Sequence, residues 1–160
     1  MRKTVKSLVA VFIALMFAPL SFAESGVQAL SPELRALLNK EMQALQSGMQ
    51  KIIPAYVTGD LAEVAHIAGK MKNSYILKQQ ITKAQQQELK TKLSHGFLRS
   101  DQEFHEYAGK LQHVAEEKHG ELVVFYYSKL MESCVSCHSR FASYRFKGFK
   151  GKRHKKGHHH

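Results

Sequence analysis

The chain has 160 residues, enough for one modest domain, and 24 Lys and Arg against 13 Asp and Glu give a formal net charge of +11. A hydrophobic share of 44% excludes a wholly disordered chain, and two cysteines are too few for a small domain built on disulfides. Taken over the whole chain, the charge suggests nucleic acid or an acidic surface as a partner.

The first segment, residues 1–23, has the layout of a secretory signal peptide. It begins with basic residues, continues with an apolar run over residues 8–17, and ends in the small-x-small pattern of residues 21–23. The apolar run is shorter than the ~20 residues that a membrane-spanning helix needs, and Pro19 interrupts it. The sequence therefore predicts cleavage after Ala23 and export, to the periplasm in a Gram-negative host, with no later membrane span.

Two helices are predicted next. Ser31 and Pro32 supply an N-cap and a first helical residue, and Gly59 marks the end of the first helix. Between them runs an apolar stripe with the spacing of a bundle helix: Leu38, Met42, Leu45, Met49, Ile52 and Tyr56. Asp60-x-x-Glu63 resembles a capping box that opens the second helix. The inner face of that helix is expected to carry Leu61, Val64, Ala68, Met71 and Tyr75.

The second half of the chain predicts two further long helices. The polar stretch over residues 78–92 should extend the second helix or form a short exposed one, and Ser94-His95-Gly96 should break the chain. Ser100-x-x-Glu103 has the spacing of a capping box for a third helix, which Gly120 ends. A fourth helix is expected over residues 121–144. Its inner side would carry Val123, Tyr126, Leu130, Ser133, Cys134, Cys137 and Phe141.

Four amphipathic helices with mostly short connections predict an all-α, up-down-up-down four-helix bundle over residues 24–144. The fourth helix contains Cys134-Val135-Ser136-Cys137-His138, which is C-x-x-C-H, the attachment signature of a c-type haem. Residues at i and i+3 share a helix face, so both thiols can reach one porphyrin, and His138 can offer its imidazole to the iron.

Three other interpretations of the two cysteines compete with covalent haem. A thioredoxin-like dithiol needs a βαβ context, a structural zinc site needs a second Cys or His pair at the right spacing, and a C-x-x-C disulfide is strained within a helix. The signal peptide, the motif and the helical body together predict one covalent haem c per chain, on the C-terminal helix.

The chain resembles the class II cytochromes c, which comprise cytochrome c′ and its low-spin relatives. The resemblance covers about residues 30–149 and depends on the motif followed by Phe141 and on Met42-x6-Met49 leading to Gly59-Asp60. It implies that the residue facing the open side of the haem comes from the first helix and falls on Met42. The chain departs from the family at Leu38 and Ala142, where basic residues are common.

A Met ligand at this position implies a six-coordinate electron carrier, and a non-ligating residue implies five-coordinate iron that binds nitric oxide or other small gases. The resemblance also implies a homodimer that pairs through the first two helices. Helix arithmetic agrees with Met42, since it lies ~15 Å from the start of its helix and His138 lies ~9 Å from the end of an antiparallel one. A methionine on a heptad stripe is otherwise ordinary core filling.

Most of the positive charge lies at the two ends of the chain. Residues 145–156 carry seven basic residues and no acidic one, and residues 24–144 have 14 basic against 13 acidic, so the body is nearly neutral. Export weighs against nucleic acid and favours an acidic redox partner or an anionic surface for the tail over residues 145–160. The final three histidines are native or part of a tag and are left out of the fold prediction.

The sequence thus predicts an exported electron-transfer protein with Cys134 and Cys137 as haem attachment sites and with His138 and Met42 as iron ligands. The alternatives are a gas-binding cytochrome c′ and, more remotely, a haem-free periplasmic module that binds metal through its tail. No catalytic constellation is present, so no conventional enzyme is expected. The remaining histidines of the body are expected at the surface: His66, His95, His105, His113 and His119.

Overall fold

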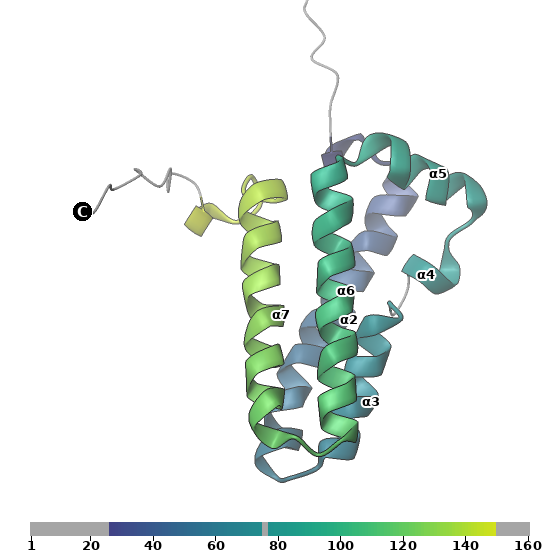
Figure 1. Cartoon of the computed structure of the whole chain (residues 1–160). Helices are drawn as coiled ribbons and strands as arrows, with labels where there is room; N and C mark the ends of the chain where they lie inside the picture. The colour runs from purple at the N-terminus through teal and green to yellow at the C-terminus, as the bar shows by residue number, and fades with distance from the viewer. Residues whose placement is uncertain (1–25, 75–76, 150–160) are drawn as a thin grey trace, which may run out of the picture.

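The computed structural model describes residues 26–74 and 77–149. The predicted signal peptide, Tyr75 and the end of the basic tail therefore lie outside the described residues. Every regular element within the described ranges is helical, which confirms the all-α prediction. The long helices α2 (Pro32–Val57), α3 (Leu61–Lys72), α6 (His95–Glu116) and α7 (Gly120–Phe141) run alternately down and up in Figure 1 and form a bundle.

The first two helices begin where the sequence predicts. The Ser31 side chain accepts a hydrogen bond from the Leu34 amide, and the Asp60 carboxylate accepts one from the Glu63 amide at 2.9 Å. Gly59 has a φ of +79°, a left-handed conformation that suits glycine, so the chain turns sharply between α2 and α3. These boundaries follow from local chemistry, which explains why they could be read from the sequence.

The polar stretch forms two short helices, α4 (Leu77–Gln80) and α5 (Lys83–Lys92), instead of extending α3. Thr82 and Gln85 make a complete capping box at the start of α5. Both short helices lie beside the first half of α2 and close a second apolar cluster there. That cluster consists of Leu30, Leu34, Leu38 and Leu93, flanked by Val27, Leu77, Ile81, Leu89, Phe97 and Leu98.

Three predicted boundaries in the second half are wrong. Helix α6 begins at His95 instead of Ser100, because the Ser94 hydroxyl caps it by accepting a bond from the Phe97 amide at 3.2 Å. It ends at Glu116, and Lys118 takes the left-handed turn with a φ of +60°, so Gly120 opens α7 instead of ending α6. Helix α7 ends at Phe141, three residues before the expected end, and the chain continues into η3 (Lys147–Phe149).

The main core lies between α2, α3, α6 and α7. Leu111 of α6 and Leu130 of α7 are fully buried in it, and Val123 is 1% exposed. The other buried members are Leu45, Met49, Ile52, Val64, Ala65, Ile67, Ala68, Met71, Phe104, Ala108, Val114 and Ala115. Within the described residues no helix is both long enough and apolar enough to cross a membrane.

We predict that Leu130→Ala lowers the free energy of unfolding by about 2–5 kcal/mol, because it opens a cavity in the main core. Leu37→Ala is a matched control: Leu37 also lies inside a long helix but is only partly buried and belongs to neither cluster. It should cost about 1 kcal/mol or less. Urea denaturation followed by circular dichroism measures both, and equal losses would contradict the assigned core.

Candidate functional site

The last two turns of α7 place the predicted site residues on two adjoining sides of one helix. Cys134 and Cys137 are unpaired and partly buried, and Cys134 packs against the main core. At about 100° per residue, Tyr127, Met131, Cys134 and His138 fall at i, i+4, i+7 and i+11 and share one stripe. Cys137 lies to one side of this stripe, close enough to Asp101 of α6 for the carboxylate charge to affect its thiol.

Both thiols are held in their neutral form. Burial raises the pKa of the Cys134 thiol above its ordinary value. Burial also raises the pKa of Cys137 to about 11, and the negative charge of Asp101 adds to the effect. Thiolates are therefore scarce at neutral pH in the folded, haem-free chain, and spontaneous oxidation or alkylation of the pair is suppressed.

The imidazole of His138 is covered by the segment that follows α7. The Phe146 ring stacks on it with centroids 4.6 Å apart and an angle of 23° between the planes, and Phe149 packs edge-on against Phe146. Burial lowers the pKa of His138, and the positive charge of Arg145 lowers it further. The neutral imidazole, which has a free nitrogen lone pair, is thereby favoured, and this is the form that binds a metal.

Two side-chain hydrogen bonds connect α7 and its end to α2. The Tyr127 hydroxyl donates to the Met49 carbonyl at 3.2 Å, and the Arg145 guanidinium donates to Asn39 Oδ1 at 2.7 Å. The start of α2 is therefore level with the end of α7, as the antiparallel arrangement predicts. Figure 1 shows α2 crossing behind α6, with its start farther from α7 than its end.

These two bonds bracket the site. Met42 lies between Asn39 and Met49 on α2, and His138 lies between Tyr127 of α7 and Arg145, which follows α7. Met42 is seven residues before Met49, so both share a helix face. Tyr127, which shares the α7 stripe with His138, reaches α2 at the Met49 backbone carbonyl. The two hydrogen bonds thus place Met42 and His138 at similar levels along α2 and α7.

The position of Met42 on α2 corrects one sequence prediction. Met42 was expected on the buried stripe, but its side chain is 36% exposed, and the neighbouring Glu41 is 1% exposed. The Glu41 carboxylate accepts a hydrogen bond from the Leu77 amide at the start of α4, at 3.2 Å. Packing of α4 and α5 against α2 therefore turns the buried face toward Glu41 and leaves Met42 at its margin, on the α7 side.

Apolar side chains remain accessible around the predicted ligands. Met131 and Val135 of α7 are each about half exposed, and Met42 is exposed to a lesser degree. Several large, accessible apolar side chains are typical of a surface that binds a ligand or a partner. Within the described residues, no three His, Cys, Asp or Glu side chains converge to hold a bare metal ion.

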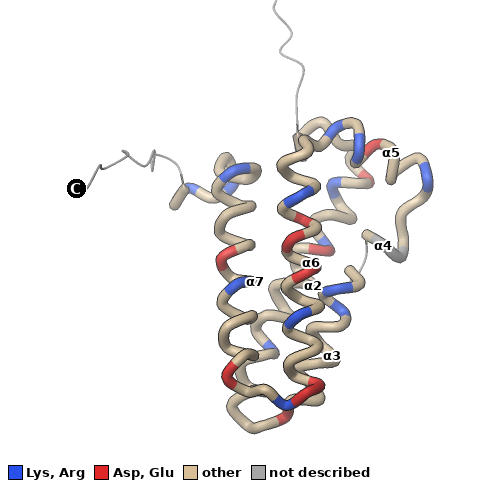
Figure 2. Tube along the Cα trace, viewed as in Figure 1, with Lys and Arg blue, Asp and Glu red and all other residues tan. Residues whose placement is uncertain are grey.

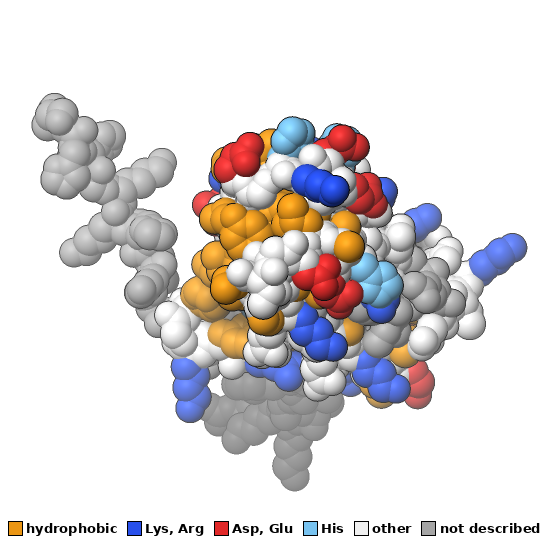
Figure 3. Space-filling model, turned by 90° about the horizontal axis from the view of Figure 1, so that it is seen from below, with side chains coloured by type: hydrophobic (Ala, Val, Ile, Leu, Met, Phe, Trp, Pro, Cys, Tyr) orange, Lys and Arg blue, Asp and Glu red, His pale blue; other side chains and the backbone are white. Residues whose placement is uncertain are grey.

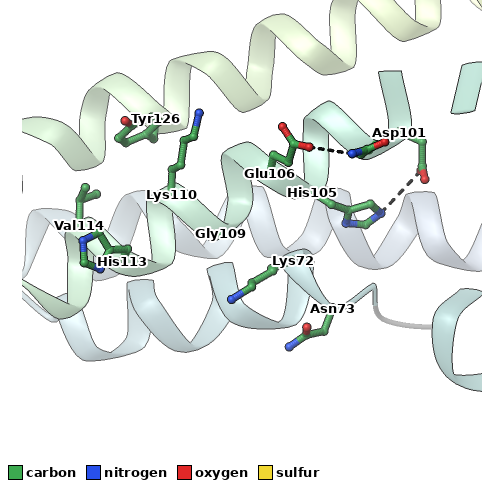
Figure 4. Close-up of a pocket in the computed structure, with 11 residues that line it drawn as sticks. Lys72, Asn73, Asp101, His105, Glu106, Gly109, Lys110, His113, Val114 and Tyr126 are labelled. Atoms are coloured by element: carbon green, nitrogen blue, oxygen red, sulfur yellow. Dashed lines mark hydrogen bonds and ion pairs between the residues drawn. The ribbon is translucent and has the colours of Figure 1, made fainter. Parts of the chain in front are cut away.

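A separate polar groove of about 810 Å³ lies mainly between α3 and α6 (Figure 4). His105 in this groove corrects a second prediction, since its side chain is only 11% exposed. Its Nδ1 lies 2.7 Å from the Met71 carbonyl oxygen and its Nε2 lies 3.6 Å from Asp101. His105 thus ties the end of α3 to α6, and none of the predicted site residues lines the groove.

Comparison of the chain with protein-family models, curated proteins and solved structures finds no match. The site is therefore interpreted from its own side chains. Sequence reasoning found the thiols, His138 and Met42, but it missed Phe146 and the bond between Arg145 and Asn39. The sequence indicates these two contacts only by a basic and an aromatic residue soon after the C-x-x-C-H motif. The segment that contains them was predicted in part as helix.

We predict that Cys137 of the folded, haem-free chain reacts with iodoacetamide at pH 8 about 100-fold more slowly than in the urea-unfolded chain. A pKa of about 11 instead of 9.0 depletes the thiolate by that factor. Peptide mass spectrometry over time measures the rates at both cysteines. Asp101→Asn should accelerate Cys137 and leave Cys134 nearly unchanged. Equal rates at Cys137 in the folded and unfolded chains would contradict this description of the site.

Proposed function

We propose that the protein is an exported c-type cytochrome that transfers single electrons through one covalently attached haem. Cys134 and Cys137 would attach the haem, and His138 and Met42 would be the protein ligands of its iron. The observation that carries the proposal is the α7 stripe of Met131, Cys134 and His138, which begins at Tyr127, where the hydroxyl bonds the Met49 carbonyl of α2, seven residues after Met42. The resemblance of the motif and its position to the class II cytochromes c supports the same function.

The residues present suit this group chemically. Each thiol would hold the haem through a thioether, formed by adding its S–H across one vinyl group of the porphyrin, which would need no external oxidant. Because Cys134 and Cys137 are free and one turn apart, neither has to break an existing bond first. Met131 and Val135 offer accessible apolar surface beside them, which excludes water and matches an apolar ring system.

The bound haem would supply an iron that cycles between its ferric and ferrous states. His138 contributes a neutral imidazole nitrogen, and the Phe146 ring and the Arg145–Asn39 bond restrain the segment beside it. A Met42 thioether bound to that iron would favour the ferrous state and raise the reduction potential. Since α2 and α7 both contribute side chains to the main core, the two helices should move little during electron transfer.

A second function has one specific observation in its favour. Met42 lies at the margin of the buried face of α2 and not within it, so packing alone does not fix its thioether. A Met42 that does not bind, or that a ligand displaces, would leave five-coordinate iron able to take nitric oxide or carbon monoxide. The protein would then be a gas-binding cytochrome c′ instead of an electron carrier.

The partner that best fits this site is a redox protein with an acidic surface. Arg140, Arg145 and Lys147 lie in the last turn of α7 and the segment that follows it, within ten residues of His138. Figure 2 shows basic positions at this end of α7. Residues 150–156, outside the described ranges, add five further basic residues. Positive charge at this end steers an acidic partner toward the haem ligand, and the proposed periplasmic location follows from residues 1–23.

We predict that the haem-loaded protein shows a weak ferric absorption band from Met ligation, and that Met42→Ala abolishes it and lowers the reduction potential. Met131→Ala is the matched control, because it removes a similarly accessible methionine from α7. It should keep the band. Absorption spectra and potentiometric titration measure both effects.

A high-spin spectrum in the unsubstituted protein, with rapid binding of carbon monoxide, would reject Met42 as a ligand and favour the gas-binding function. Loss of the band in Met131→Ala but not in Met42→Ala would also contradict the proposed ligation.

A further inference from the structure

A second cavity, of about 490 Å³, lies where the end of α7 meets the start of α6, and we call it the end pocket. Residues of η2 (Gly26–Ala29) and of the end of α5 complete its lining. Its volume is larger than a simple ion needs and falls within the range of small-molecule sites. The end pocket is distinct from the polar groove between α3 and α6, with which it shares no lining residue.

Much of the inner surface of the end pocket is apolar. Val27, Leu93 and Phe97 line it and also form part of the second apolar cluster or pack against it. Phe141 of α7 lines the opposite side and packs edge-on against Phe97, with ring centroids 5.4 Å apart. A ligand that fits this surface therefore has an apolar body, since burying that surface is favourable.

The charged side chains of the end pocket are positive. They are Lys92, in the last turn of α5, and Arg140, in the last turn of α7. Among the described residues, no Asp or Glu lines the pocket to balance them. Because a partly enclosed cavity strengthens the attraction between opposite charges, the ligand that suits it also has an anionic group.

Two other places on the molecule are less suited to such a ligand. The polar groove is lined by Asp101 and Glu106 as well as by lysines, so its charges balance. At the opposite end of the bundle, Figure 3 shows acidic side chains beside hydrophobic ones, and these would repel an anion. The end pocket therefore combines positive charge and apolar surface where these two places do not.

The end pocket adjoins the proposed haem-binding residues. Arg140 follows His138 by two residues and Cys137 by one helical turn, about 4.5 Å along the axis of α7. Its charge reaches the Cys137 thiol: burial raises the pKa of that thiol most, and the guanidinium of Arg140 acts against the rise. A porphyrin held by the two thiols would thus lie next to the pocket. Haem has two propionate side chains, which are carboxylates on an apolar ring.

We propose that the end pocket binds the propionate carboxylates of the haem, with Lys92 and Arg140 as their ionic partners. This inference rests on the proposed function and extends the haem site beyond the motif and Met42. Lys92 comes from α5, a helix that contributes none of the other candidate residues. Two positive charges match the two carboxylates, which are the only groups on the haem that are fully charged outside the iron centre.

The first test measures binding of mesoporphyrin IX to the mature chain without haem, by fluorescence titration. This porphyrin has both propionates but neither iron nor vinyl groups, so axial ligation and thioether formation cannot contribute. Lys92→Gln and Arg140→Gln should each raise its dissociation constant about fivefold, the effect of one accessible ion pair. Lys90→Gln is the matched control, because Lys90 lies in the same turn of α5 but does not line the pocket. It should change the constant by about twofold at most.

The dimethyl ester of mesoporphyrin separates the effect of the carboxylates from that of the ring. It has no charge to lose, so it should bind the unsubstituted chain and both variants equally. Equal affinity of the free acid for all three chains would overturn the proposal. An equal loss of affinity for the acid and the ester would also overturn it, since the two residues would then act through the fold.

A free carboxylate ligand is the other source of the same chemistry, and 1-naphthoate distinguishes the two. If the propionates occupy the end pocket, equilibrium dialysis should find no binding of 1-naphthoate to the haem-loaded chain that Lys92→Gln weakens. Such binding would show a pocket that stays open beside the haem and would overturn the assignment. Failure of the proposed function is separate: the chain would gain no haem mass in cells, whatever its affinity for mesoporphyrin.

Discussion

The rotation of α7 about its own axis is the constraint on which the site depends. Burial of Val123 and Leu130 in the main core fixes that rotation, because both side chains are almost completely removed from water. The helix period then places the neighbouring stripe, with Tyr127, Met131, Cys134 and His138, beside that buried face. The hydroxyl of Tyr127 holds α2 at one end of this stripe, and Arg145 holds it at the other. Packing of the core therefore sets the orientation of the candidate residues on α7, although none of the proposed haem-binding residues is fully buried.

The rotation of α2 about its own axis depends on different contacts, those with α4 and α5. The short helices α4 and α5 close an apolar cluster over Leu34 and Leu38, and the buried Glu41 carboxylate accepts a hydrogen bond from the start of α4. A buried carboxylate that lacked such partners would be costly, so Glu41 and the α4 segment stabilise each other's positions. Met42 follows Glu41 and consequently lies on the flank of α2 that faces α7. The segment of α4 and α5 thus determines the position of Met42 on α2, although the segment itself contributes no candidate iron ligand.

Local signals predicted the fold well where one residue type decides the geometry. The caps at Ser31 and Asp60, the turn at Gly59 and the C-x-x-C-H spacing depend on neighbours within a few residues. Two boundaries were missed although their signals are local: the Ser94 hydroxyl caps α6 at His95, and Lys118 takes the left-handed turn that Gly120 was expected to make. Prediction otherwise failed where distant contacts decide. The predicted stripe on α2 is wrong at one position, where Glu41 is buried instead of Met42, because α4 and α5 were not expected to pack there. The hydrogen bond from Arg145 to Asn39 joins residues 106 positions apart, so no local sequence pattern indicates it.

The two ends of the bundle differ in chemistry. One end carries the thiols, His138 and basic residues, and the other carries exposed apolar side chains of α2 and α7 among acidic residues. The central claim is that the haem is covalent, and its most direct test is the mass of the chain after expression with a haem-attachment system. Electrospray mass spectrometry in acid and organic solvent should find a chain beginning at Glu24 with the added mass of one haem. A mass without haem, under conditions that load another c-type cytochrome, would contradict the account.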